Sequence, residues 1–329
     1  PVFRLFGLRD VLLLRRLGLQ GVAFDLRRQL LDGSTPMHDA LLGYLTAHHL
    51  GAITCVFRAR QAEDGLSGFV QVSAVATDAD WDLAYMAPSL DYHLDAGGAW
   101  CRMLGNLVLL GADAEMYARL EPLAAKGALI ALVGAAGLAG PAPVDVGRLH
   151  YDGLGLMGTA SAEIGAAYAP IRTEFQPGGC MALVGAAGPM GQMHFQRALQ
   201  APVPPRVIAA TSRVMDRLHL LPAKYASLID ARSDVTRVLT LASTGISPEA
   251  FVTALCNATD GKGYDDVVIL APSAGVVEQT YPLLAPGGVM NIFAGLPRGT
   301  RAMLDLTAVV SKGVRLIGSS GSLIDDLRH

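Results

Sequence analysis

The sequence has little charge and little cysteine. Asp, Glu, Lys and Arg make up only 17% of its 329 residues, and the formal net charge at pH 7 is -3. Nucleic-acid binding needs an excess of positive charge, so we expect no nucleic-acid partner. The four cysteines, Cys55, Cys101, Cys180 and Cys256, lie far apart, with no Cys-x-x-Cys pair and no close histidine. This spacing is typical of reduced, cytosolic cysteine, and we expect neither a metal site nor a disulfide framework.

The sequence also shows no leader and no membrane span. Residues 1–14 lack the charged start, apolar core and small cleavage residues of a signal peptide. The longest uncharged run, 127–144, contains four glycines and two prolines, which favours a buried strand and a loop over a membrane helix. We therefore expect a cytoplasmic protein with no membrane partner. Because the chain starts without methionine and stops within a predicted helix at 325–329, we expect it to be a fragment.

Apolar residues, in contrast, make up 51% of the chain. A length of 329 residues suits two domains of ordinary size. Parallel sheets that are covered on both faces have strands that are apolar throughout, and such sheets produce this composition. The composition therefore favours an α/β fold.

One stretch predicts a phosphate-binding turn. An apolar run, 180–184, leads into a glycine-rich turn, and a helical pattern over 192–199 follows. A dinucleotide pyrophosphate needs this order of strand, turn and helix, because the backbone must approach closely and free N–H groups must point at the phosphates. The pattern is A-x-G-x-x-G, and a tight turn without a ligand remains the alternative. The turn residues predicted to contact the cofactor are Gly185, Ala186, Gly188, Pro189, Met190 and Gly191.

Two stretches of the chain repeat each other at a constant offset of 160 residues. Leu107–Leu110 matches Val267–Leu270, and Leu156–Thr159 matches Leu316–Ser319, with no gap between the two matches. Chance is a poor explanation for so long a register, so we infer that the chain contains the same half-domain twice. In each copy strands alternate with helices and glycine turns, which is the signature of a doubly wound parallel sheet.

The predicted fold is therefore α/β, with two tandem doubly wound parallel-sheet (Rossmann-type) domains related by duplication. A degenerate domain is expected over 1–173 and an NAD(P)-binding domain over 174–329. The strands predicted in the second copy are Met181–Val184, Val207–Ala210, Ser227–Ile229, Val267–Leu270, Val289–Phe293 and Val314–Ile317.

The front of the first copy matches the second more weakly, at an offset of 153 that places Thr54–Phe57 on Val207–Ala210. Under that alignment Thr35 and His38 stand where the second copy has its two turn glycines. Their side chains would fill the space that a pyrophosphate needs, so we expect no cofactor in the first copy.

Three segments carry a resemblance to a known family: Val184–His194, Phe293–Thr300 and Ile317–Ser322. They resemble the medium-chain dehydrogenases/reductases of the zinc-type alcohol/sorbitol dehydrogenase kind, in particular a sorbose 1-phosphate reductase-like branch, from about Gly105 to the end. The resemblance implies an NAD(P)(H)-dependent oxidoreductase that acts on a small-molecule alcohol, polyol or sugar phosphate. Such proteins normally add a GroES-like catalytic domain, often with zinc. We find no Gly-His-Glu motif or cysteine cluster here, so that domain lies outside the chain or its chemistry is lost.

The residues after the second predicted strand address the choice between NADP and NAD. Thr211, Ser212 and Arg213 offer hydroxyls and a positive charge where NAD-binding proteins carry a carboxylate, so NADP is favoured and NAD is the second choice. The alternative is that Arg213 is only a surface residue at a helix start. By resemblance, later strand ends complete the pocket, unless they only shape turns: Ala271, Pro272 and Ser273 at the ribose, and Ala294, Gly295, Leu296, Ser319 and Ser320 beside the nicotinamide.

The sequence names no catalytic residue. His194 is expected to be a helix or interface histidine, and adjacent His48 and His49 cannot share one helix face as metal ligands. Asp145 and Asp305 occupy equivalent positions in the two copies, which favours a shared capping role over catalysis.

Two functions remain open. The first is an NADP(H)-dependent oxidoreductase that transfers a hydride to or from an alcohol, polyol or sugar-phosphate carbon. The alternative is a non-catalytic assembly or scaffold protein derived from a dehydrogenase. A further hypothesis is that Leu154–Gly158 and Val314–Gly318 pair inside the single chain and hide two exposed sheet edges. Self-association through sheet edges is a separate expectation.

Overall fold

The computed structural model describes part of the chain in detail. The residues that it describes are 54–58, 69–74, 81–86, 104–110, 114, 117–118, 121–134, 141–161, 165–168, 172, 174–213 and 215–318.

These residues fall into two compact units. The first unit contains the described residues up to 144, those of 154–170, and 305–313. The second unit contains 145–153, the described residues of 171–304, and those from 314 onward. The main change of unit, at 170/171, lies close to the boundary expected at 173/174. The sequence did not predict that each unit would also contain a short segment from the other half of the chain.

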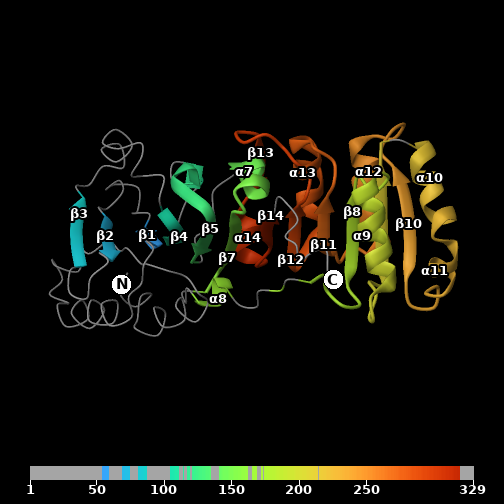
Figure 1. Ribbon diagram of the computed structural model, residues 1–329, viewed down its shortest axis with the longest axis horizontal. Coiled ribbons are helices and arrows are strands. Elements are labelled where there is room, and N and C mark those ends of the chain that lie inside the picture. Colours follow the sequence, from blue (N-terminus) through green and yellow to red (C-terminus); the bar gives the residue numbers. More distant parts are fainter. Residues whose placement is uncertain are drawn as a thin grey trace. The chain divides into compact units, whose positions relative to one another are not determined.

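The second unit is built on six parallel strands (Figure 1). Their order is β10-β9-β8-β11-β12-β14. In chain order this is 3-2-1-4-5-6, the arrangement of a doubly wound dinucleotide-binding sheet. The strands are β8 (Cys180–Val184), β9 (Val207–Ser212), β10 (Arg237–Ala242), β11 (Tyr264–Ile269), β12 (Leu284–Ile292) and β14 (Arg315–Gly318).

Helices of the second unit follow the strands and bury their apolar faces. All five residues of β8 are buried, and Phe195 of α9 and Leu218 of α10 belong to the same core cluster as Leu183. The helices are α7 (Val146–Tyr151), α9 (Pro189–Gln200), α10 (Met215–Lys224), α11 (Ala226–Asp230), α12 (Pro248–Ala258), α13 (Ala274–Thr280) and the 3-10 helix η3 (Tyr281–Leu283).

Five of the six predicted strands of this unit are confirmed, and one is wrong. Ser227–Ile229 lies inside helix α11, where Leu228 and Ile229 pack against the core cluster. The sixth strand is β10, the edge strand, which starts at Arg237 and keeps most of its residues partly exposed. A half-exposed edge strand lacks the continuous apolar run that identifies central parallel strands. The apolar residues of a short helix, 227–229, were therefore predicted as the strand instead of β10.

The first unit contains a smaller parallel sheet in the order β1-β4-β5-β7. An antiparallel pair, β2 and β3, forms a separate two-stranded sheet. The strands are β1 (Thr54–Arg58), β2 (Phe69–Ala74), β3 (Trp81–Met86), β4 (Leu104–Leu110), β5 (Ala124–Val133) and β7 (Gly155–Thr159). The helices of this unit are the 3-10 helix η2 (Glu121–Leu123), α8 (Gly165–Tyr168) and α14 (Thr307–Ser311). Two short strands end where the chain changes unit: β6 (Pro141–Asp145) precedes α7, and β13 (Arg301–Asp305) precedes α14.

Several elements of the same kind in the two units lie 160 residues apart. The helix η2 spans 121–123 and η3 spans 281–283. The irregularities coincide as well, because β4 shifts register against β5 between Leu104 and Asn106, and β11 shifts against β12 between Tyr264 and Asp266.

Strand pairing corrects the alignment of the front of the first copy. β1 pairs with β4, whereas β8 pairs with β11, the counterpart of β4. Under the offset of 160, β1 therefore takes the place of β8, and the predicted match of Thr54–Phe57 with Val207–Ala210 does not agree with the strand pairing. Two neighbouring apolar strands look alike in sequence, and only their pairing distinguishes them. Thr35 and His38, which that alignment placed at the turn, lie outside the described residues; the segment from the end of β1, 58–64, contains no glycine either.

Candidate functional site

The turn between β8 and α9 has the backbone geometry that the sequence predicts. Gly185 has a φ of 100°, a conformation that residues with a side chain rarely adopt. The N–H groups of Gly185 and Ala186 both donate to the Thr211 carbonyl, at 3.0 and 2.8 Å. The end of β9 therefore holds the turn in place.

The other two glycines of the turn meet different constraints. A Cβ on Gly191 would overlap the backbone of Ala186, so only glycine lets α9 pack this closely against the turn. A Cβ on Gly188 would meet no atom within 4 Å, so the space beside its α-carbon is open. A tight turn, close helix packing and room for a pyrophosphate are the three functions of glycine in dinucleotide-binding turns. The turn therefore fits a dinucleotide.

The start of α9 offers hydrogen-bond donors to an anion. Gly188 is the N-cap and provides no side-chain cap, and Pro189 follows as the first helical residue. The first N–H groups of a helix have no intrahelical acceptor, and the helix dipole favours negative charge at this end. The N–H groups of Met190 and Gly191 are thus placed to meet a phosphate.

The end of β9 carries the three residues expected at the 2′-position of the ribose. Thr211 is buried, Ser212 is partly exposed and Arg213 is exposed. The Arg213 carbonyl accepts a hydrogen bond of 2.7 Å from the Thr244 hydroxyl, so its backbone is fixed while its side chain lies in solvent. The structure therefore leaves the Arg213 guanidinium accessible near the glycine turn.

The remaining predicted residues follow the other strands of the same parallel sheet. A Cβ on Gly185 would lie 2.8 Å from the Ala271 nitrogen, so the residues after β11 adjoin the turn. Ala271 is partly exposed, whereas Pro272 and Ser273 are exposed. After β12, the Ala294 N–H donates to the Ile269 carbonyl at 2.8 Å. Ala294 and Leu296 are buried, Gly295 is exposed, and Ser319 and Ser320 lie outside the described residues.

Helix α7 brings two side chains to Gly295 that the sequence did not single out. A Cβ on Gly295 would lie 2.7 Å from the Tyr151 hydroxyl and 3.7 Å from His150 Nε2. His150 Nδ1 lies 3.1 Å from the Ile292 carbonyl, which fixes the ring against the end of β12. The sequence repeat could have identified this pair. At the offset of 160, Val310 and Ser311 stand where the first copy has His150 and Tyr151, so the two copies differ at these positions.

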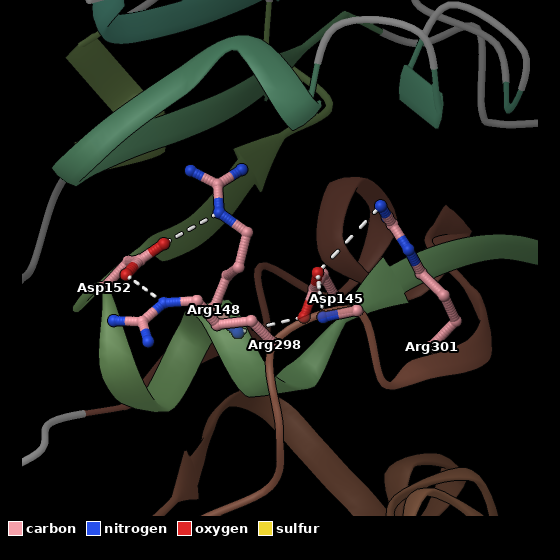
Figure 2. Close-up of polar contacts among 6 residues, drawn as sticks. Asp145, Arg148, Asp152, Arg298 and Arg301 are labelled. Atoms are coloured by element: carbon pink, nitrogen blue, oxygen red, sulfur yellow. Dashed lines mark hydrogen bonds and ion pairs between the residues drawn. The ribbon is translucent and has the colours of Figure 1, made fainter. Parts of the chain in front are cut away.

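A cluster of charged side chains fastens α7 to the segment after β12 (Figure 2). Asp145 caps the helix by accepting from the Arg148 N–H at 3.0 Å, and it also accepts from the Gly299 N–H at 2.9 Å. Asp152 accepts from the Nε atoms of Arg148 and Arg298, both at 2.8 Å. Burial raises the pKa of Asp152, but the hydrogen bonds and charges of the two arginines outweigh burial and lower it overall.

The expectations for His194, Asp145 and Asp305 are confirmed. His194 Nδ1 lies 2.8 Å from the Met190 carbonyl within α9, and its ring meets the edge of Phe293. Asp305 accepts from the Thr307 N–H at 3.0 Å, two residues further on, so it caps the turn just before α14, whereas Asp145 caps α7 itself. These contacts give all three residues a structural role, and His48 and His49 lie outside the described residues.

The described residues include no group of three or more His, Cys, Asp or Glu side chains that could hold a metal ion. They therefore do not fit the zinc of alcohol dehydrogenases. Within the same residues, no helix is both long enough and apolar enough to span a membrane.

Comparison with known proteins finds dehydrogenases and reductases that match part of the chain. Over 201 residues the chain is 32% identical to mannitol-1-phosphate 5-dehydrogenase of Aliivibrio fischeri. This alignment covers 56% of this chain and 47% of the relative. It is 28% identical over 155 residues to L-sorbose 1-phosphate reductase of Klebsiella pneumoniae, which covers 46% of this chain and 35% of the relative. The chain is similar to polyol- and sugar-phosphate dehydrogenases. It spans less than half of the length of either relative, and no family model matches it.

Solved structures give partial matches. Benzyl alcohol dehydrogenase from Acinetobacter calcoaceticus matches with a TM-score of 0.33 and 22% identity, over 45% of this chain and 35% of that one. A protein from Sinorhizobium meliloti, described as a zinc-binding dehydrogenase bound to NADP, matches with a TM-score of 0.36 and 21% identity, over 47% and 41% of the two chains. The fold of this polyol-dehydrogenase-like chain therefore rests on its own strand order. The resemblance inferred from the sequence is confirmed by the sugar-phosphate dehydrogenase and reductase above.

Proposed function

We propose that the chain is the nucleotide-binding part of an NADP(H)-dependent oxidoreductase that transfers a hydride to or from an alcohol, polyol or sugar-phosphate carbon. The observation that carries the proposal is the division of roles among Gly185, Gly188 and Gly191. The bound nicotinamide would supply the hydride chemistry. The residues of the second unit would bind and orient it.

Each part of the turn has a role in this proposal. The open space at Gly188 admits the pyrophosphate, and the N–H groups of Met190 and Gly191 donate to its oxygens. Ser212 and Arg213 receive the 2′-phosphate. NADP is preferred to NAD because no carboxylate stands at the end of β9 to bind the ribose hydroxyls and repel a phosphate.

Tandem duplication of one half-domain is part of the proposal, with domains at 1–173 and 174–329. The constant offset of 160 between equivalent elements supports it, as does the shared register shift in the two sheets. Only the second copy would bind cofactor, because no glycine stands at 58–64, where strand pairing puts the matching turn.

The experiment is a titration of NADPH and NADH into the intact chain, followed by nucleotide emission. We expect saturable binding with NADPH the tighter ligand. Gly188→Trp should abolish it, because the indole fills the open space without contacting the core. Val203→Trp is the control, since Val203 is 55% exposed and precedes β9, at the amino ends of the strands, whereas the glycine turn follows the carboxyl end of β8. No saturable binding by the wild type, or binding retained by Gly188→Trp, would support the non-catalytic assembly protein in its place.

A further inference from the structure

The proposed function assigns no role to two polar side chains near Gly295, those of Tyr151 and Arg298. Tyr151 comes from α7, and Arg298 comes from the segment after β12. The central carbon of the Arg298 guanidinium lies 5.2 Å from the centre of the Tyr151 ring. The Tyr151 hydroxyl stands 2.7 Å from where a Cβ on Gly295 would be. Both side chains therefore adjoin the segment that the proposed function puts beside the nicotinamide.

Arg298 keeps most of its hydrogen-bonding capacity. Its Nε donates to Asp152, and its side chain is 57% exposed. Among the residues that the structure describes, its two terminal nitrogens have no partner. A guanidinium in this state presents a planar pair of N–H donors, which match two oxygens of a phosphate.

The charges around Arg298 also favour an anion. Asp152 is shared between Arg148 and Arg298, and Arg301 lies 4.0 Å from Asp145 (Figure 2). Within this cluster Asp152 accepts only from the Nε atom of Arg298, so the two terminal nitrogens of the guanidinium stay directed elsewhere. Arg298 is the member of the cluster that lies against Tyr151, and it is exposed.

The backbone holds α7 and the Arg298 segment in a fixed relation. The Val146 N–H donates to the Thr300 carbonyl at 3.0 Å, and the Gly299 N–H donates to Asp145. A Cβ on Gly147 would overlap the carbonyl of Pro297, so the two segments touch too closely for any side chain to separate them. Tyr151 and Arg298 are thus positioned before any ligand arrives.

Helix α14, which matches α7 at the offset of 160, lacks the tyrosine and the aspartate. In α14 the residues that match Tyr151 and Asp152 are Ser311 and Lys312. At the two matched positions, the aromatic hydroxyl and the aspartate that anchors two arginines are therefore present in α7 and absent from α14. Helix α7 belongs to the second unit, which also has the glycine turn.

We propose that Tyr151 and Arg298 bind the phosphate group of a phosphorylated polyol or sugar substrate. This inference rests on the proposed function and narrows its substrate class to phosphate monoesters. Arg298 contributes two N–H donors and the charge, and Tyr151 contributes its hydroxyl. The alcohol carbon of the same molecule would then extend past Gly295 toward the nicotinamide.

The test is calorimetric titration of mannitol 1-phosphate, and of mannitol, into the intact chain with and without saturating NADPH. Neither reactant can pass a hydride to the other, so binding is measured without turnover. We expect the wild type to bind the phosphorylated polyol and to bind mannitol at least tenfold more weakly. Arg298→Gln should weaken binding of the phosphorylated polyol about tenfold or more, which is 1.4 kcal/mol or more, and leave the Kd for NADPH within about twofold.

Matched variants separate phosphate recognition from general charge or misfolding. Arg301→Gln removes an equal charge from the same cluster and should leave binding of mannitol 1-phosphate unchanged. Gly295→Ala keeps every charge, but its Cβ displaces the Tyr151 hydroxyl, so it should weaken the same binding.

Several results would overturn the inference: no binding by the wild type, equal affinity for mannitol, full affinity in Arg298→Gln, or equal losses in Arg298→Gln and Arg301→Gln. Failure of the wild type to bind NADPH would instead overturn the proposed function. The titration of mannitol 1-phosphate without NADPH distinguishes this failure from a failure of the inference.

Discussion

At the scale of single residues, the glycine turn makes opposite demands at two neighbouring positions. Gly191 lies against the Ala186 backbone, whereas Gly188 faces open space with an ordinary φ of -79°. Gly191→Ala should therefore destabilise the fold by about 1–3 kcal/mol, because the added methyl group forces α9 away from the turn. Urea unfolding measures the change. Gly188→Ala is the matched control and should unfold within about 0.5 kcal/mol of the wild type. Equal stability of the two variants would show that the close contact at Gly191 is absent.

Asp152 predicts a dependence of stability on pH. Its two arginines lower its pKa below the ordinary value of 3.8. A lowered pKa in the folded state stabilises the fold above the unfolded value, and this stabilisation disappears as the pH falls through the folded value. Asp152→Asn should therefore cost about 1 kcal/mol at pH 7, and the difference from the wild type should shrink once the pH falls below 3.8. Denaturant unfolding at a series of pH values checks this, and a difference that does not depend on pH would contradict it.

At the scale of helices and strands, the sequence predicts central elements better than peripheral ones. β8, β9, β11, β12 and β14 are found because buried parallel strands are apolar throughout. β10 is missed because an edge strand is half exposed and carries Arg237. The alignment of the front of the first copy is uncertain for a similar reason, because the sequence of β1 resembles those of β9 and β8 equally. Only the pairing of β1 with β4 distinguishes the two alignments.

The candidate site was predictable in part for a related reason. The glycine turn is local in sequence, so its residues and their spacing are visible there. Tyr151 and Arg298 come together only because α7 belongs to the second unit, and no local pattern gives the contact of residues that far apart. The contrast between Tyr151 and Ser311 in the two copies was the one signal available.

Helix α7 provides a prediction at this scale. Asp145 caps the helix and also accepts the Gly299 N–H, so Asp145→Ala should speed amide hydrogen exchange over 146–151 by about tenfold, equivalent to the loss of one helix cap. Asp305→Ala is the counterpart at α14 and should affect 307–311 without changing exchange in α7. Unchanged exchange over 146–151 in Asp145→Ala would mean that the cap does not hold the helix.

At the scale of the whole molecule, the proposal predicts different cofactor binding by the two units. Both sheets have a register shift at positions 160 residues apart. Under the proposed duplication, no glycine stands over 58–64, where the matching turn would be, and Val310 and Ser311 stand where the other copy has His150 and Tyr151. One unit would bind the dinucleotide and the other would not. The pairing of Leu154–Gly158 with Val314–Gly318, and self-association through sheet edges, stay predictions.

The central claim is cofactor binding at the turn between β8 and α9 and nowhere else. The most direct measurement is the stoichiometry of NADPH binding to the intact chain by isothermal titration calorimetry. The account predicts one NADPH per chain, none in Gly188→Trp, and one again in Val203→Trp. Two NADPH per chain would show that the first unit also binds cofactor, and none in the wild type would contradict the claim.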